Sequence, residues 1–131
     1  MKVIVKGQLV NYKDEGAGKV LLLLHGWGQT LQTFDDVAEH FSNNYRVIRV
    51  DFPGFGGSPK PSDDWHIDDY AKFVEDFLQK VDVDTVYAVL AHSFGGRITI
   101  KAAAKKYFDV EKLVLMGYAG VKPSEIGRAH V

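Results

Sequence analysis

Apolar runs, alternating segments and helical stripes follow one another along the chain. The run at 20–25 ("VLLLLH") has no polar face, which is typical of a strand buried on both sides of a parallel sheet. Further strands are predicted at 45–52 ("YRVIRVDF"), 85–91 ("TVYAVLA") and 112–117 ("KLVLMG"). Ahead of them, the alternation in "KVIVKGQLVNYKDEG" predicts two short strands that join at Lys6 and Gly7.

Residues at helical spacing separate the later strands. A first helical stripe is formed by Phe34, Val37, Ala38 and Phe41. A second helix is predicted from about Asp68 to Lys80, with "SDD" at 62–64 as its expected caps, and a third over 95–107 ("GGRITIKAAAKKY"). This order predicts an α/β fold, a mostly parallel sheet with helices on both faces and a leading antiparallel hairpin.

Composition narrows the class of protein. A length of 131 residues predicts one domain, and a net charge of −1 with scattered basic residues argues against nucleic acid or membrane as partner. The chain has no cysteine, which excludes disulfides and thiolate chemistry, and no two histidines have metal-ligand spacing, so no metal is expected. Without a signal peptide or an apolar span of membrane length, a cytoplasmic location is expected.

The segment "LAHSFGGR" at 90–97 carries the candidate chemistry. Ser93 follows a predicted strand directly, and Ala91 and Gly95 provide the small neighbours that a sharp turn from strand to helix requires. The N-terminus of the following helix would point its free N–H groups at the serine. Such a serine is either a nucleophile or an ordinary helix cap, and this segment alone leaves both readings open.

Two more glycine-rich turns follow predicted strands. In "HGWG", Gly26 and Gly28 let the backbone cross the top of the sheet, which makes the amide of Trp27 a candidate donor beside that of Phe94. The turn "DFPGFGGS" at 51–58 follows the next strand. Each could be a plain loop, but all three occur at carboxyl ends of strands, where sites form in such sheets.

With these motifs in this order, residues 2 to about 122 resemble the N-terminal part of an α/β-hydrolase. The resemblance implies that Ser93 is the nucleophile and that the backbone N–H groups of Trp27 and Phe94 form the oxyanion hole. It also implies an eight-stranded sheet, no cofactor, and hydrolysis of an ester, amide or activated carbon–carbon bond. A serine instead of aspartate at position 93 speaks against the dehalogenase and epoxide-hydrolase branches. The supporting positions are His25, Gly26, Gly28, His92 and Gly95.

A serine nucleophile needs a histidine base and an acid that orients it, which follow the serine in this fold. Asp109 and Glu111 are expected to be turn charges at the far end of the last strand, and Glu125 and His130 belong to a tail without apolar periodicity. His92 is expected to point away from the serine, and His25 to order its own loop. His40 and His66 are interpreted as helix-surface or capping positions.

Residues 1–124 are therefore interpreted as a partial α/β-hydrolase domain, without the lid, last strands, acid and histidine of longer family members. The origin of the tail 125–131 stays open: native chain, cloning scar or frame-shifted end. We expect an N-terminal piece of a serine hydrolase with little turnover alone, whose full-length parent acts on a small ester-like substrate. The alternative is a non-catalytic fragment that forms homo-oligomers by pairing or swapping at the edge of the last strand.

Overall fold

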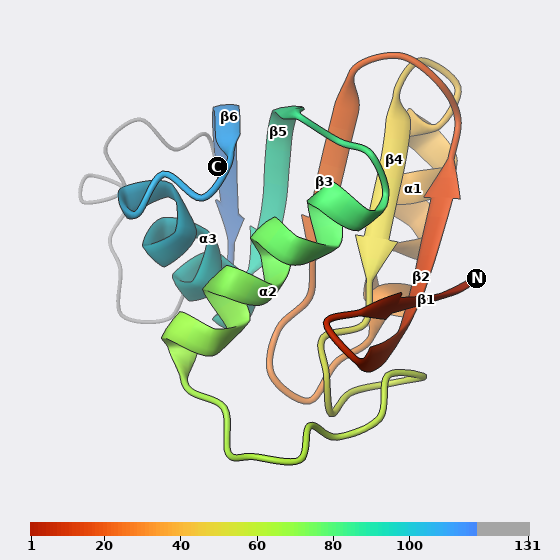
Figure 1. Cartoon of the computed structure of the whole chain (residues 1–131). Helices are drawn as coiled ribbons and strands as arrows, with labels where there is room; N and C mark the ends of the chain where they lie inside the picture. The colour runs from red at the N-terminus through yellow and green to blue at the C-terminus, as the bar shows by residue number, and fades with distance from the viewer. Residues whose placement is uncertain (118–131) are drawn as a thin grey trace.

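The computed structural model describes residues 1–117, which form one six-stranded sheet in the order β1-β2-β4-β3-β5-β6 (Figure 1). The first two strands form an antiparallel hairpin, and β2 is antiparallel to β4, whereas β4, β3, β5 and β6 are mutually parallel. The predicted mostly parallel sheet with a leading hairpin is confirmed. The strands are β1 Lys2–Val5, β2 Gln8–Glu15, β3 Val20–Leu24, β4 Arg46–Val50, β5 Thr85–His92 and β6 Asp109–Met116.

Helices cover both faces of this sheet, as predicted (Figure 1). The short helix η1 (Leu31–Phe34) and α1 (Asp35–Phe41) pack on one face, against Leu21 and Leu23. The helices α2 (Ile67–Lys80) and α3 (Phe94–Ala104) cover the other face, where Leu22 and Leu24 are buried. Successive side chains of β3 therefore enter opposite cores, which is why this strand has no polar position.

Three element ends differ from the prediction. The strand β6 begins at Asp109 because its register with β5 extends to Thr85, so Asp109 and Glu111 lie on the strand and not in a turn. The helix α3 ends at Ala104, two residues before Lys106, whose φ of 58° cannot continue a right-handed helix. The N-cap of α2 is His66, whose N–H donates to the carboxylate of Asp69 at 2.8 Å, so residues 62–64 do not cap this helix.

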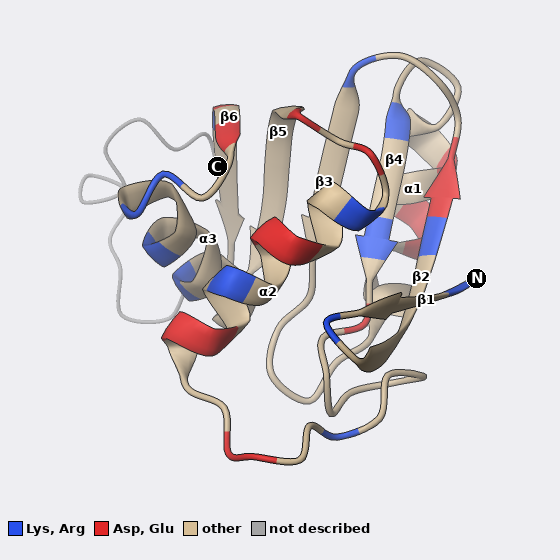
Figure 2. Ribbon diagram, viewed as in Figure 1, with Lys and Arg blue, Asp and Glu red and all other residues tan. Residues whose placement is uncertain are grey.

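Charges are dispersed over the described residues, with Lys and Arg interspersed with Asp and Glu along the ribbon (Figure 2). None of the helices within residues 1–117 is both long and apolar enough to cross a membrane. The parallel strands all end at one edge of the sheet, and the loops that follow β3, β4 and β5 gather there. The glycine-rich motifs and Ser93 are on these loops.

Candidate active site

Ser93 alone forms the turn between β5 and α3. Its backbone has φ 51° and ψ −107°, a conformation that costs free energy in any residue with a side chain. The Ser93 N–H donates to the carbonyl of Met116 at 3.1 Å, which ties the turn to the end of β6. Its hydroxyl makes no capping hydrogen bond to the helix, unlike an ordinary capping serine. The geometry is that of a strained elbow that leaves the hydroxyl free.

Gly95 holds the first turn of α3 against the end of β3. A Cβ at this position would lie 2.5 Å from the carbonyl oxygen of Leu24 and 2.8 Å from that of His25. Both atoms belong to the backbone, which cannot rotate away as a side chain can. Only glycine therefore permits this approach, which places the N-terminus of α3 over the edge of the sheet.

Two backbone N–H groups near the elbow have no acceptor. Among the hydrogen bonds within residues 1–117, none is donated by the amide of Trp27 or of Phe94. The two residues are neighbours, since their rings meet edge to face with centroids 5.0 Å apart. The Phe94 amide lies at the N-terminus of α3, directly after Ser93, and a free amide in such a position can stabilise a negative charge that forms nearby.

Gln29 links the loop that carries Trp27 to the elbow, a role that the sequence analysis missed. Its Oε1 accepts the Gly26 N–H at 2.8 Å and lies 3.0 Å from Nδ1 of His92. A carboxamide oxygen only accepts, so the proton of the His92 ring is on Nδ1. Gly26 and Gly28 predict a turn that ends at Gln29, and this is the sequence signal that could have indicated the contact; in the structure the Gln29 N–H closes the turn on the Gly26 carbonyl at 3.1 Å.

His25 is fully buried, and both of its ring nitrogens are occupied. Nδ1 donates to the carbonyl of Gly26 at 2.7 Å, and Nε2 accepts the N–H of Phe52 at 3.0 Å. The ring also meets the edges or faces of Phe52 and Phe55. His25 therefore orders its own loop, as the sequence suggested, and has no free lone pair to act as a base for Ser93.

Burial lowers the pKa of His25 from its ordinary value of 6.5, against smaller opposing effects of the Gly26 carbonyl and Asp51. The unfolded chain therefore takes up a proton at a pH where the folded chain does not, so stability is lost as the pH falls below about 6.5. We expect replacement of His25 by asparagine to reduce this loss by about 1–2 kcal/mol between about pH 7.5 and pH 5. Denaturant unfolding at both pH values measures the loss. An unchanged dependence in His25→Asn would contradict the burial effect.

Asp51 is the second residue that the sequence analysis missed. It is 2% exposed, and its Oδ1 accepts the Leu31 N–H at 2.7 Å. Its Oδ2 accepts the side-chain amide of Asn11 and the Gly57 N–H, both at 2.9 Å. One carboxylate thus joins β2, the start of η1 and the loop after β4. An aspartate directly after an apolar strand and before "FPG" is the signal that could have indicated it.

The described residues provide no evident general base for Ser93. His40 lies on α1 and His66 at the N-terminus of α2, and neither forms a hydrogen bond with Ser93. In the register of β5 and β6, Met116 lies opposite His92 whereas Asp109 lies opposite Thr85, about 23 Å along the strand. Glu125 and His130 lie outside the described residues. Within residues 1–117, no group of three metal-ligating side chains occurs.

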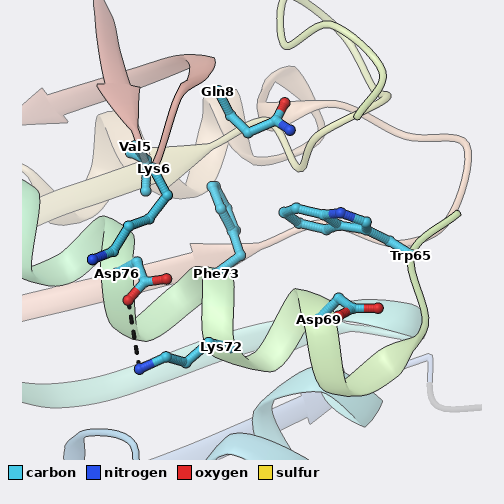
Figure 3. A pocket seen from close by; sticks show the side chains of 8 residues that line it. All are labelled: Val5, Lys6, Gln8, Trp65, Asp69, Lys72, Phe73 and Asp76. Atoms are coloured by element: carbon cyan, nitrogen blue, oxygen red, sulfur yellow. Dashed lines mark ion pairs between the residues drawn. The ribbon is translucent and has the colours of Figure 1, made fainter. Parts of the chain in front are cut away.

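Three clefts adjoin the loop that connects β4 to α2, and two of them have aromatic side chains in their walls. The larger has a volume of about 630 Å³ and lies between this loop, Trp27 and Tyr70. The smaller, of about 190 Å³, lies between the hairpin and α2, where Figure 3 shows Lys6, Lys72, Asp69 and Asp76 around the rings of Phe73 and Trp65. Lys72 is already paired with Asp76 at 3.6 Å and with Glu75, so this smaller cleft offers few free charges.

The family model described as the alpha/beta hydrolase fold matches residues 19–126, which is most of the chain. The chain belongs to the α/β-hydrolase family. It is 35% identical over 127 residues to 2-hydroxymuconate semialdehyde hydrolase of Pseudomonas sp. (strain CF600), a match that covers 92% of this chain and 44% of that protein. This agrees with the resemblance stated from the motifs.

Solved structures of this family superimpose on the chain over nearly its whole length. A bacterial membrane phospholipase A has a TM-score of 0.86 at 30% identity, with 95% of this chain and 41% of that chain covered. The epoxide hydrolase CorEH has a TM-score of 0.84 at 26% identity, with 93% and 45% covered. The chain spans less than half the length of each of these relatives. Their names cover different substrates, so the family alone does not select one.

Proposed function

We propose that this chain is the nucleophile-bearing part of a serine hydrolase. Ser93 attacks a carbonyl carbon, and the amides of Trp27 and Phe94 hold the oxyanion that results. The observation that carries the proposal is the backbone of Ser93, with φ 51° and a hydroxyl that caps nothing. A strained conformation persists only where the surroundings impose it, and here Gly95 and the end of β6 impose it.

We also propose that residues 1–117 provide no general base for Ser93. His25 has both nitrogens bound, and His92 directs Nδ1 to Gln29 and Nε2 towards Gly117. A serine hydroxyl without a base to take its proton is a poor nucleophile. The chain by itself should therefore hydrolyse esters little, and the general base and its acid would come from elsewhere in a full-length parent.

The rate of p-nitrophenyl acetate hydrolysis tests this directly. We expect the wild-type chain and Ser93→Ala to hydrolyse the ester at the same rate within error, because residues 1–117 place no free base beside Ser93. The Ser93→Ala variant is a matched control, since removal of one hydroxyl leaves the turn intact. A rate that is tenfold or more higher in the wild type would refute the missing base and would direct attention to His92 and His130.

Self-association through β6 is the second candidate. Within residues 1–117, β6 pairs with β5 on one side only, and its half-buried apolar residues Leu113 and Val114 lie at that edge. Exposed strand edges invite pairing with another chain. Two copies can pair antiparallel about a two-fold axis in a register that places Glu111 opposite Lys112 of the second copy. The symmetry then also places Lys112 opposite Glu111 of the second copy.

Static light scattering over a range of concentrations measures this association. We expect a dimer in the wild type, weakened in Lys112→Glu because carboxylates then face each other. The double variant Glu111→Lys/Lys112→Glu restores the opposite charges and should recover the dimer. A wild type that stays monomeric at high concentration would end this candidate without affecting the proposed role of Ser93.

A further inference from the structure

The larger cleft has aromatic walls from three separate segments. Trp27 comes from the loop after β3, Phe55 and Trp65 from the loop between β4 and α2, and Tyr70 from α2 itself. Their rings support one another: Trp27 and Phe55 have centroids 4.8 Å apart, and Trp65 and Tyr70 5.1 Å. A volume of about 630 Å³ is typical of sites for small organic molecules.

Trp27 connects this cleft to the elbow. Its backbone amide is one of the two free donors, and its ring packs on Phe94, the residue after Ser93. The ring also forms part of the cleft wall, where it remains 66% exposed. A carbonyl bound at Ser93 would therefore have its substituent within reach of an aromatic surface that still faces solvent.

The chemistry of the cleft separates possible substituents. Tyr70 offers no free hydroxyl, because its O–H donates to the carbonyl of Pro53 at 3.2 Å. The charged groups at the cleft are exposed: one ammonium, of Lys60, and two carboxylates, of Asp63 and Asp64. The walls thus offer mainly ring faces and edges, with the indole N–H groups of Trp27 and Trp65 as donors, and the rim disfavours an anion.

We propose that this cleft receives an uncharged aromatic group of the substrate, the aryl substituent of the ester or related carbonyl compound that Ser93 attacks. That the bound molecule is a substrate rests on the proposed function of Ser93. The binding of its aromatic group does not. Covering Trp27 removes a large apolar surface from water, and edge-to-face contacts with the four rings favour a flat ring over an alkyl chain.

Intrinsic fluorescence tests the inference, since the chain has two tryptophans and both line this cleft. We expect phenylacetamide to change the emission saturably, and hexanamide and the anion phenylacetate to bind at least about fivefold more weakly. The Trp27→Ala variant should bind phenylacetamide about tenfold more weakly, as reported by Trp65, and Trp27→Phe should recover most of the affinity. Tyr87→Ser, on the opposite face of the sheet, is the control and should bind as the wild type does.

The outcomes distinguish a failure of the proposed aromatic binding from a failure of the proposed role of Ser93. Ser93→Ala should bind phenylacetamide with unchanged affinity, because the ring contacts do not involve the hydroxyl. Equal affinity for phenylacetamide and hexanamide, or an affinity that Trp27→Ala leaves unchanged, would overturn the inference while leaving the nucleophile in place. If aromatic binding behaves as expected but Ser93 never becomes acylated, the proposed function fails and the aromatic site remains.

Discussion

Replacement of Gly95 by alanine should lower the free energy of unfolding by about 3 kcal/mol or more. The new Cβ would lie 2.5 Å and 2.8 Å from two carbonyl oxygens at the end of β3, distances that real Cβ atoms do not adopt. Relief requires α3 to move away from the sheet, which exposes Ile98 and Ala102 of the core. Denaturant unfolding followed by circular dichroism measures the change.

Gly7→Ala is the matched control for this prediction. Gly7 has a φ of +80°, so alanine there is strained, but nothing lies within 4 Å of the added Cβ. Its cost should be about 1 kcal/mol, from the backbone conformation alone. If Gly95→Ala destabilises the chain no more than Gly7→Ala does, the close approach of α3 to β3 is wrong, and so is the position of Ser93.

Removal of the Asp51 carboxylate should destabilise the chain by a similarly large amount. Asp51→Ala leaves the N–H of Leu31, the N–H of Gly57 and the side-chain amide of Asn11 without their acceptor. Each lost hydrogen bond to a charged group costs about 1.5–3 kcal/mol, and relaxation recovers part, so we expect a loss of about 3–5 kcal/mol. Thermal or denaturant unfolding provides the measurement.

The Asp51→Asn variant shows how much of this loss comes from hydrogen bonding and how much from the volume of the side chain. The asparagine keeps the shape but presents an NH₂ group to at least one of the three donors, so it should still cost about 2 kcal/mol. The control is Asp84→Ala, an exposed carboxylate whose loss should stay within about 0.5 kcal/mol. An Asp51→Asn variant as stable as the wild type would show that the carboxylate does not hold these loops together.

The sequence predicts most of the fold because its periodicity is unambiguous. The apolar side chains of residues 20–24 pack into the cores on both faces of the sheet. The alternation of apolar and polar residues over 2–15 agrees with the hairpin, in which Val3 pairs with Val10. The start of β6 was predicted three residues late, because its first half is an exposed edge where Asp109 and Glu111 replace apolar residues. An apolar run identifies the buried part of such a strand but not its solvated part.

The candidate site, like the fold, has parts that the sequence predicts and parts that it does not. Small residues at positions 91 and 95 indicate the elbow, since the steric requirement is local in the sequence. Asp51 and Gln29 could not be identified so readily, because their partners lie on other loops: Asn11 is 40 residues from Asp51, and His92 is 63 from Gln29. The aromatic cleft likewise combines residues from three segments, and only the folded chain brings them together.

Acetylation of Ser93 would show directly whether its hydroxyl is a nucleophile. In the presence of imidazole as an external base, p-nitrophenyl acetate should transfer its acetyl group to the Ser93 hydroxyl: imidazole takes the proton and p-nitrophenolate leaves. Mass spectrometry of the intact chain, with peptide mapping, locates the label. We expect acetyl-Ser93 in a yield that rises with the imidazole concentration, and no such label in Ser93→Ala. A label confined to lysines, in equal yield with and without the serine, would contradict it.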